Sequence, residues 1–226
     1  GFIGSTIEGD TDPTYSKIFT YSFVSGSGDT DNALFAITEG SFFNLVSNTT
    51  FDFESKDTYS IRLQTEDGNG LKFEKSLNIN VSNLAEAPTD LTLSASNIDE
   101  NNTINAVLGS LTTTDEDAGE SYTYSLVSGT GDTDNSSFVI ENDKLQAGEV
   151  FDFETKDSYS IRIQTNDGNT NTFAKSFTIT VGDTFENPSD ITLNVNYLNE
   201  KNSIGDVVAN LSTTDDDSGE TYTYAL

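Results

Sequence analysis

The stretch FDFETKDSYSIRIQTNDGN, residues 151–169, decides the fold class of this 226-residue chain. Apolar residues occupy positions 159, 161 and 163, and polar residues occupy the positions between them. Farther along, Phe173, Phe177, Ile179 and Val181 also share one parity. Alternation with a period of two is the pattern of a half-buried β-strand, and the Asp-Gly-Asn between the two segments is typical of a turn. The stretch therefore predicts two half-buried strands joined by a turn.

The same text appears earlier in the chain as FDFESKDTYSIRLQTEDGN, residues 51–69, exactly one period of 100 residues before. A third, partial copy begins after Pro188, where TTDDD at 213–217 echoes TTDED at 113–117. A unit of this length is too long for the stacked repeats of a solenoid and suits an independent sandwich domain. We expect three units: residues 1–86 as a repeat that lacks its first strand, 87–186 as a complete repeat, and 187–226 as the N-terminal part of a third.

Each repeat contains further short alternating segments, separated by clusters of Gly, Asp and Asn that favour turns. No segment has a helical period over three turns. About seven short strands in a repeat of this size predict an all-β, immunoglobulin-like Greek-key β-sandwich. Several aromatic residues recur at strand spacing and are therefore expected in the core: Phe51, Phe53, Tyr59, Phe73, Tyr122 and Tyr124.

The strongly negative net charge of the chain disfavours two classes of binding partner. The 38 acidic residues outnumber the 10 basic ones and give a formal charge of -28, which disfavours nucleic acid and anionic membranes. Acidic disordered tails lack regular apolar alternation, so we expect a folded chain. Self-repulsion of this size favours bound cations.

The chain has no Cys and no His. Disulfides, thiolate sites, His-based triads and nearly all zinc chemistry are therefore excluded, and hard oxygen ligands remain. No apolar run approaches the ~20 residues of a membrane span, so we expect no membrane insertion in this segment and an export signal outside it. A glycosidase pair such as Asp152 and Glu154 is disfavoured, because such acids need a cleft and a recurring structural unit explains them better. We expect no enzyme activity.

Four motifs recur in the same order along the chain: an early Glu, as in Ile98-Asp99-Glu100-Asn101, an Asp-x-Asp pair, an x-Asp-x-Glu strand, and Asp-Gly after a strand. This ordered set resembles the cadherin repeat, in the variant strung together in very large bacterial surface proteins. The resemblance covers essentially the whole chain. It implies tandem cadherin-like domains in a linear array, an extracellular location, and Ca²⁺ bound between consecutive domains.

The chemistry of the x-Asp-x-Glu motif is compatible with calcium. If the segment is extended, Asp152 and Glu154 project to one side, while Phe151 and Phe153 anchor the other side in the core. Calcium takes six to eight oxygen ligands, more than one short loop offers here. Pooling ligands across a junction between domains would meet that need.

The resemblance assigns candidate ligands to two junctions. The first junction takes Asp52, Glu54, Asn83, Glu86, Asp115, Asp117 and Asp167. The second junction takes Glu100, Asp152, Glu154, Asp183, Glu186, Asn187, Asp215 and Asp217. Both linkers are one residue shorter than the family pattern Asp-x-Asn-Asp-Asn-x-Pro. The first linker has fewer oxygen donors, with Ala87 at the position of Asn187, so we expect it to hold fewer or weaker ions.

Two alternatives compete with calcium. A row of carboxylates on an acidic protein can be a solvated face, although charge clustered this densely would then repel itself. In the Gly-Asp-Thr-Asp-Asn loops, turn formation is favoured over a local ion for Asp29, Asp31, Asp132 and Asp134.

The leading hypothesis is a calcium-stiffened stalk or filament segment of a secreted or cell-surface bacterial protein that serves adhesion. Its partners would be neighbouring repeats of the same chain, with other copies, surface proteins or polysaccharide as further candidates. The alternative is a polysaccharide- or protein-binding module of a secreted multidomain protein. The absence of Trp disfavours it, since carbohydrate sites usually present exposed aromatic platforms, and it also gives no basis for Trp-mediated strand exchange.

Overall fold

The computed structural model describes residues 19–226. Its regular structure is β throughout, apart from two short 3₁₀ turns, η1 (Asn32–Leu34) and η2 (Asn135–Ser137). The chain divides between Leu84 and Ala85 into two compact units. The opening part of the first expected repeat, residues 1–18, lies outside the described residues. In residues 19–226, neither short helix has the length and apolar character needed to cross a membrane.

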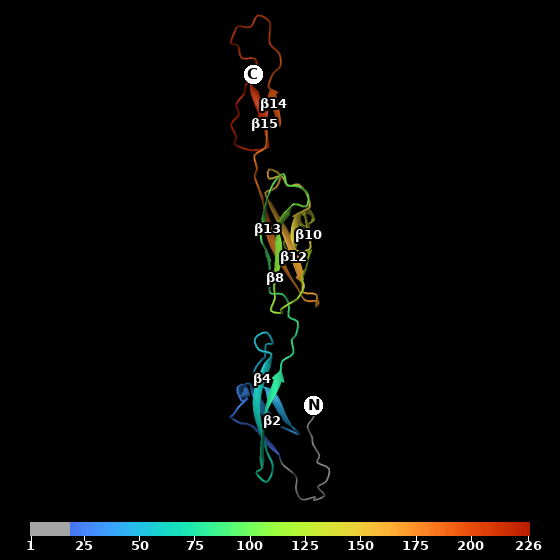
Figure 1. Cartoon of the computed structure of the whole chain (residues 1–226). Helices are drawn as coiled ribbons and strands as arrows, with labels where there is room; N and C mark the ends of the chain where they lie inside the picture. Colours follow the sequence, from blue (N-terminus) through green and yellow to red (C-terminus); the bar gives the residue numbers. More distant parts are fainter. Residues whose placement is uncertain (1–18) are drawn as a thin grey trace. The chain divides into compact units, whose positions relative to one another are not determined.

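The second unit contains a complete sandwich, which we call the middle domain (Figure 1). One sheet has the strand order β10-β11-β8-β6 and the other has the order β7-β13-β12-β9. The strands are β6 (Asp90–Leu93), β7 (Asn97–Asp99), β8 (Val107–Thr114), β9 (Thr123–Leu126), β10 (Phe138–Glu141), β11 (Lys144–Ala147), β12 (Ser158–Asn166) and β13 (Thr172–Gly182).

The strand predictions for this domain are confirmed except at Phe151–Glu154, which lies between β11 and β12. β12 pairs antiparallel with β13 over its whole length, with Ser158 opposite Thr180 and Asn166 opposite Thr172. β7 runs parallel to β13, and the chain crosses between the two sheets after β6, β7, β8, β9 and β11. The result is the all-β sandwich that the alternating pattern predicts.

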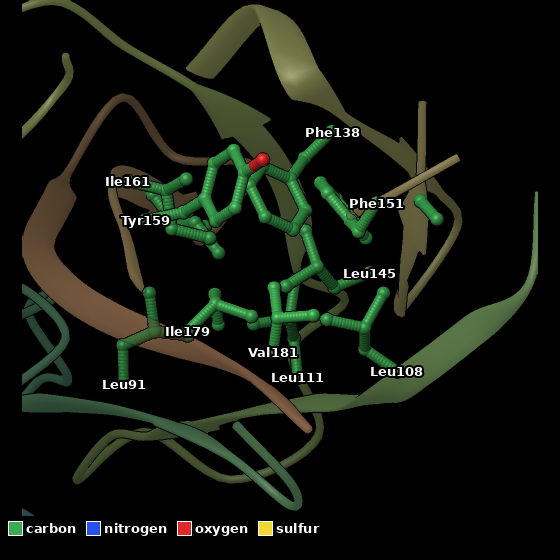
Figure 2. Close-up of a cluster of buried hydrophobic side chains, with 12 residues drawn as sticks. Leu91, Leu108, Leu111, Phe138, Leu145, Phe151, Tyr159, Ile161, Ile179 and Val181 are labelled. Carbon is green, nitrogen blue, oxygen red and sulfur yellow. The ribbon is translucent and has the colours of Figure 1, made fainter. Parts of the chain in front are cut away.

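The core of the middle domain is built from the predicted parity. Tyr159, Ile161 and Ile163 are buried on β12, and Ile179 and Val181 are buried beside them on β13. Figure 2 shows the rings of Phe138, Phe151 and Tyr159 gathered at one side of the cluster, with Leu and Ile side chains filling the rest.

Residues beyond the middle domain begin the third copy. β14 (Asp190–Leu193) pairs with β15 (Leu211–Thr214), with Asp190 opposite Thr214. This register repeats that of β6 and β8, where Asp90 lies opposite Thr114. The two strands carry an incomplete core: Ile191 is 61% exposed, whereas its counterpart Leu91 is fully buried.

The first unit has a three-stranded sheet of β1 (Thr20–Phe23), β4 (Thr58–Glu66) and β5 (Lys72–Asn80), and a hairpin of β2 (Phe35–Glu39) and β3 (Phe43–Ser47). Phe35, Tyr59 and Ile61 are its buried apolar residues. The prediction that Phe73 lies in the core is wrong, because this side chain is 65% exposed. Its counterpart Phe173 packs against the core of the middle domain, where β6 lies beside β13. The described part of the first unit has no strand that corresponds to β6.

Candidate metal centres

The Gly-Asp-Thr-Asp-Asn loops use their carboxylates inside the protein. In the middle domain, Asp134 accepts a hydrogen bond from the Ser160 backbone N–H (2.7 Å) and forms an ion pair with Lys156. Lys156 also lies over the ring of Tyr159, with 4.4 Å from Nζ to the ring centroid. Burial alone would raise the pKa of Asp134, but the hydrogen bonds from Lys156 and Ser160 outweigh it and lower the pKa. Asp132 caps the turn by accepting the Gly129 N–H (2.9 Å). These contacts account for both carboxylates without an ion.

The Phe151–Glu154 segment differs from the expectation of an extended strand. It forms a turn, in which the Lys156 N–H donates to the Asp152 carbonyl (2.9 Å). The Asp152 carboxylate accepts hydrogen bonds from the Thr155 N–H and hydroxyl, both at 2.8 Å, and these lower its pKa. The two acids of the motif therefore have different environments: Asp152 closes its own turn, and Glu154 joins other carboxylates. In the first unit, Asp52 accepts the equivalent bonds from Ser55.

Glu100, just after β7, organises one end of the middle domain although it is only 5% exposed. Its Oε2 accepts the Phe153 N–H (2.8 Å) and its Oε1 accepts the Thr184 N–H (2.8 Å). One carboxylate thereby ties the turn that carries Glu154 to the linker that carries Glu186. Oxygens of Glu100, Glu154 and Glu186 lie within 4.8 Å of one another.

A second group of oxygens lies beside the first and reaches the third repeat. Glu154, Asp183 and Asp217 also place one oxygen each within 4.8 Å of the others. Asp217 is 5% exposed, and its Oδ2 accepts the Glu186 N–H (2.7 Å). The side-chain amide of Asn101 donates to Glu186. We call Glu100, Glu154, Asp183, Glu186 and Asp217 the lower cluster, although this end of the middle domain, next to the third repeat, is drawn uppermost in Figure 1.

The electrostatics of the lower cluster favour a positive partner. Burial, followed by the charges of neighbouring carboxylates, raises the pKa of Glu154 and of Asp183. Burial also raises the pKa of Glu186, against the hydrogen bond from Asn101 that lowers it. A carboxylate whose charge is disfavoured in this way is stabilised either by a proton or by a cation. Neither Lys nor Arg is paired with these five acids among the ion pairs of the described residues.

The opposite end of the middle domain has a comparable cluster. Asp115, Asp117 and Glu120, all between β8 and β9, bring one oxygen each within 4.8 Å. The Glu86 N–H donates to Asp117 Oδ2 (2.8 Å), as Glu186 does to Asp217. Asp167, after β12, is 3% exposed. We call Asp115, Asp117, Glu120 and Asp167 the upper cluster.

Most of the predicted ligands of the second unit fall in or beside these clusters. Asp215 groups with Asp217 and Glu220, whereas Asp152 belongs to none of the carboxylate groups within 4.8 Å found in residues 19–226. The role of the amide Asn187 stays a prediction. Two acids, Glu120 and Glu220, were missed. The signal was in the sequence, since both copies read Asp-x-Asp-x-Gly-Glu, at 115–120 and 215–220. Asp52, Glu54 and Asn83 lie in the first unit.

The donor set fits a hard divalent cation. Every candidate ligand is a carboxylate or amide oxygen, as calcium prefers. Buried carboxylate oxygens of Asp115, Asp167, Asp215 and Asp217 accept no hydrogen bond. Buried polar atoms are normally paired, and a cation would supply a partner for these carboxylate oxygens.

Comparison with known proteins supports the fold. No protein-family model matches the sequence, and no curated protein resembles it significantly. Among solved structures, the extracellular cadherin domains 1–5 of protocadherin gamma B2 superpose with a TM-score of 0.62 at 19% identity, over 89% of this chain and 39% of that one. The fold is cadherin-like. The protocadherin gamma B4 extracellular domain gives 0.60 at 25% identity, covering 89% of this chain and 32% of that one. Domains EC1–2 of human protocadherin-24 give a TM-score of 0.56 at 16% sequence identity, over 74% of this chain and 82% of that one.

The chain thus spans less than half the length of the protocadherin gamma structures that it matches. The matched structures are extracellular cadherin domains in tandem.

The raised pKa values predict an unusual pH dependence in the absence of calcium. Free carboxyls titrate near 3.8 for Asp and 4.5 for Glu, whereas Asp183, Glu154 and Glu186 titrate higher in the folded chain. The folded state therefore holds more protons in this window, and its stability should fall as pH rises from these ordinary values through the raised ones.

Below about pH 3.8 the trend should reverse, because Asp134 and Asp152 have lowered pKa values and lose their hydrogen bonds on protonation. Thermal melts of the chelated protein across this range should show a stability maximum at mildly acidic pH. Saturating calcium should remove the fall on the alkaline side. A chelated protein that is steadily more stable toward neutral pH would contradict the charge repulsion inferred for the lower cluster.

Proposed function

We propose that this chain is a calcium-binding structural repeat of an extracellular bacterial adhesin, stalk or filament, in which Ca²⁺ stiffens the junctions between repeats. The observation that carries the proposal is the lower cluster, because its acids come from three separate parts of the second unit. Glu100 and Glu154 come from the middle domain, Asp183 and Glu186 from the linker, and Asp217 from the third repeat. A cation shared by all three would link the two repeats through the linker.

The mechanism is mechanical and electrostatic. Without a cation, the lower cluster concentrates negative charge at a point where two repeats meet, which favours separation. With calcium, the same charges become ligands that hold the linker and both repeats in one geometry. A rod built in this way would project a distal binding domain from the cell surface.

The first junction is proposed on sequence equivalence. Asp52 and Glu54 correspond to Asp152 and Glu154, Asn83 and Glu86 to Asp183 and Glu186, and Asp115 and Asp117 to Asp215 and Asp217. Asp167 adds a ligand from the middle domain. We propose the same role for this set, with weaker binding because Asn83 has one charge fewer than Asp183.

Calcium titration tests the proposal directly. After chelation, adding calcium should release or absorb heat in a calorimeter and raise the melting temperature, because the ion binds only the folded state. In small-angle scattering, a longer version with complete flanking repeats should change from a flexible to a rod-like profile. The double variant Asp152→Ala, Glu154→Ala should stay flexible in calcium.

Two results would count against the proposal at different levels. No heat and no melting shift at about 1 mM calcium, the weak end of extracellular sites, would exclude the metal. Binding with an unchanged scattering profile would leave a calcium protein whose ions do not set the geometry of the junction.

A further inference from the structure

The linker that leads into the middle domain is hydrogen-bonded to two loops of that domain at Glu86. The Glu86 N–H donates to Asp117 Oδ2 (2.8 Å) in the loop between β8 and β9. The side-chain amide of Asn171, in the loop between β12 and β13, donates to the carbonyl oxygens of Glu86 (2.9 Å) and Ala85 (3.2 Å). Two separate loops therefore hold both backbone polar groups of Glu86, and none of the three bonds involves a cation.

The bonded segment leads directly into the first strand of the domain. Pro88 is buried, and the Thr89 N–H donates to the Thr114 carbonyl (2.8 Å), one residue before β6 begins to pair with β8. On the other side of Ala85, Leu84 is 75% exposed. The boundary between the two compact units also falls between Leu84 and Ala85. The linker from Ala85 onward therefore belongs to the middle domain.

The first unit offers a natural comparison for Asn171. In its loop after β4, Asp67 Oδ1 accepts the Leu71 N–H (2.9 Å), as Asp167 Oδ1 accepts the Asn171 N–H (3.1 Å) in the middle domain. Leu71 stands at the position of Asn171, is 70% exposed and has no amide in its side chain. Because the loop closes with either residue, the side-chain amide of Asn171 is not required for the fold of its own loop.

We propose that Asn171 is a positioning residue that clamps the linker to the middle domain without a cation. Two hydrogen bonds from one amide to consecutive carbonyls fix the direction of the chain at Ala85 and Glu86. An oxygen of Glu86 lies within 4.8 Å of an oxygen of Asp117, so the clamp also holds two proposed ligands together. This consequence for calcium rests on the proposed function, whereas the clamp itself does not. Chelation should then loosen the chain before Ala85 and leave residues 85–86 docked.

The order of the linker in chelator tests the clamp, measured on the full chain by ¹⁵N NMR relaxation. In the parent, the amides of Ala85 and Glu86 should be as rigid as those of β12 and β13, with an order parameter of about 0.85. Asn171→Leu places the residue of the first unit in the same loop and removes both donated bonds. The order parameters of Ala85 and Glu86 should then fall to about 0.6 or below, while those of β12 and β13 stay unchanged.

Two further variants are the controls. Asn171→Asp keeps the shape of the side chain but cannot donate, so it should loosen the linker as Asn171→Leu does. Asn69→Leu makes the same exchange of residues at an exposed position of the corresponding loop in the first unit, and should leave the linker rigid. A rigid linker in Asn171→Leu would refute the clamp. Loss of order in β12 and β13 as well would also refute it, because Asn171 would then hold the whole domain together.

Calcium separates this inference from the function on which its consequence rests. If the parent binds calcium, a titration followed at the Glu86 amide should require about 10-fold more ion in Asn171→Leu, a typical loss when a group that orients metal ligands is removed. An equal midpoint in the two proteins would refute the prearrangement of Glu86 and leave the calcium function standing. If the parent shows no response at about 1 mM calcium, the proposed function fails, and the order measured in chelator still decides the clamp.

Discussion

Replacing Phe151 with Ala should reduce the unfolding free energy of the middle domain by about 3–5 kcal/mol, the usual cost of deleting a fully buried ring. Phe151 is 1% exposed, and its ring lies 5.3 Å from that of Phe138 and 4.8 Å from that of Tyr159, measured between centroids. The loss should be visible as a lower urea midpoint for residues of the middle domain, followed by NMR in calcium.

The same substitution should also disturb the lower cluster. The backbone of Phe151 accepts the Asn101 N–H (3.0 Å) and donates to Asn102 Oδ1 (2.9 Å), so a shift of Phe151 would disturb the turn that presents Glu154. Calcium affinity should therefore fall together with stability. Phe51→Ala is the matched control, because Phe51 is only half-buried in the smaller core of the first unit. This substitution should reduce the unfolding free energy by less than Phe151→Ala does. A loss below about 1 kcal/mol for Phe151→Ala would mean that the ring does not hold the core together.

The strands of the middle domain and their buried faces could be predicted because burial repeats with the period of the backbone. Tyr159, Ile161 and Ile163 face the core for the same reason that they alternate in the sequence. The carboxylate turn could not be predicted in this way. Phe151 and Phe153 have strand parity, but the hydrogen bonds of Asp152 to Thr155 close a turn that alternation does not encode.

The candidate site was predictable where a motif fixes local geometry, and not where distant segments meet. Asp115 and Asp117 were found as an Asp-x-Asp pair, and the structure groups them. Glu120 recurs as Glu220 but belongs to none of the four expected motifs, and the side-chain amide that bonds its carboxylate comes from Asn169, 49 residues away. The exposure of Phe73 has a similar origin, because the burial of an aromatic residue depends on a covering strand elsewhere in the chain.

The largest effect on calcium binding is expected for Asp217→Asn. Asp217 contributes an oxygen to the group with Glu154 and Asp183 and also to the group with Asp215 and Glu220, so it is shared by two candidate ions. Its Oδ2 accepts the Glu186 N–H, and an Asn oxygen can still accept that bond. The substitution therefore removes a ligand charge while preserving the local fold.

Calcium affinity at the second junction should fall by about 100-fold or more, since even the outer partners of metal ligands are typically worth ~10- to 100-fold. Asp216→Asn is the matched control, because it removes the same charge one residue away. The Asp216 side chain is exposed and joins none of the carboxylate groups found in the described part of the chain. Calorimetric titration should give parental binding for Asp216→Asn. Equal affinity in the two variants would show that bulk negative charge, and not coordination by Asp217, attracts the ion. In chelator, Asp217→Asn should melt no lower than the parent, because the repulsion that Asp217 exerts on Asp183 is relieved.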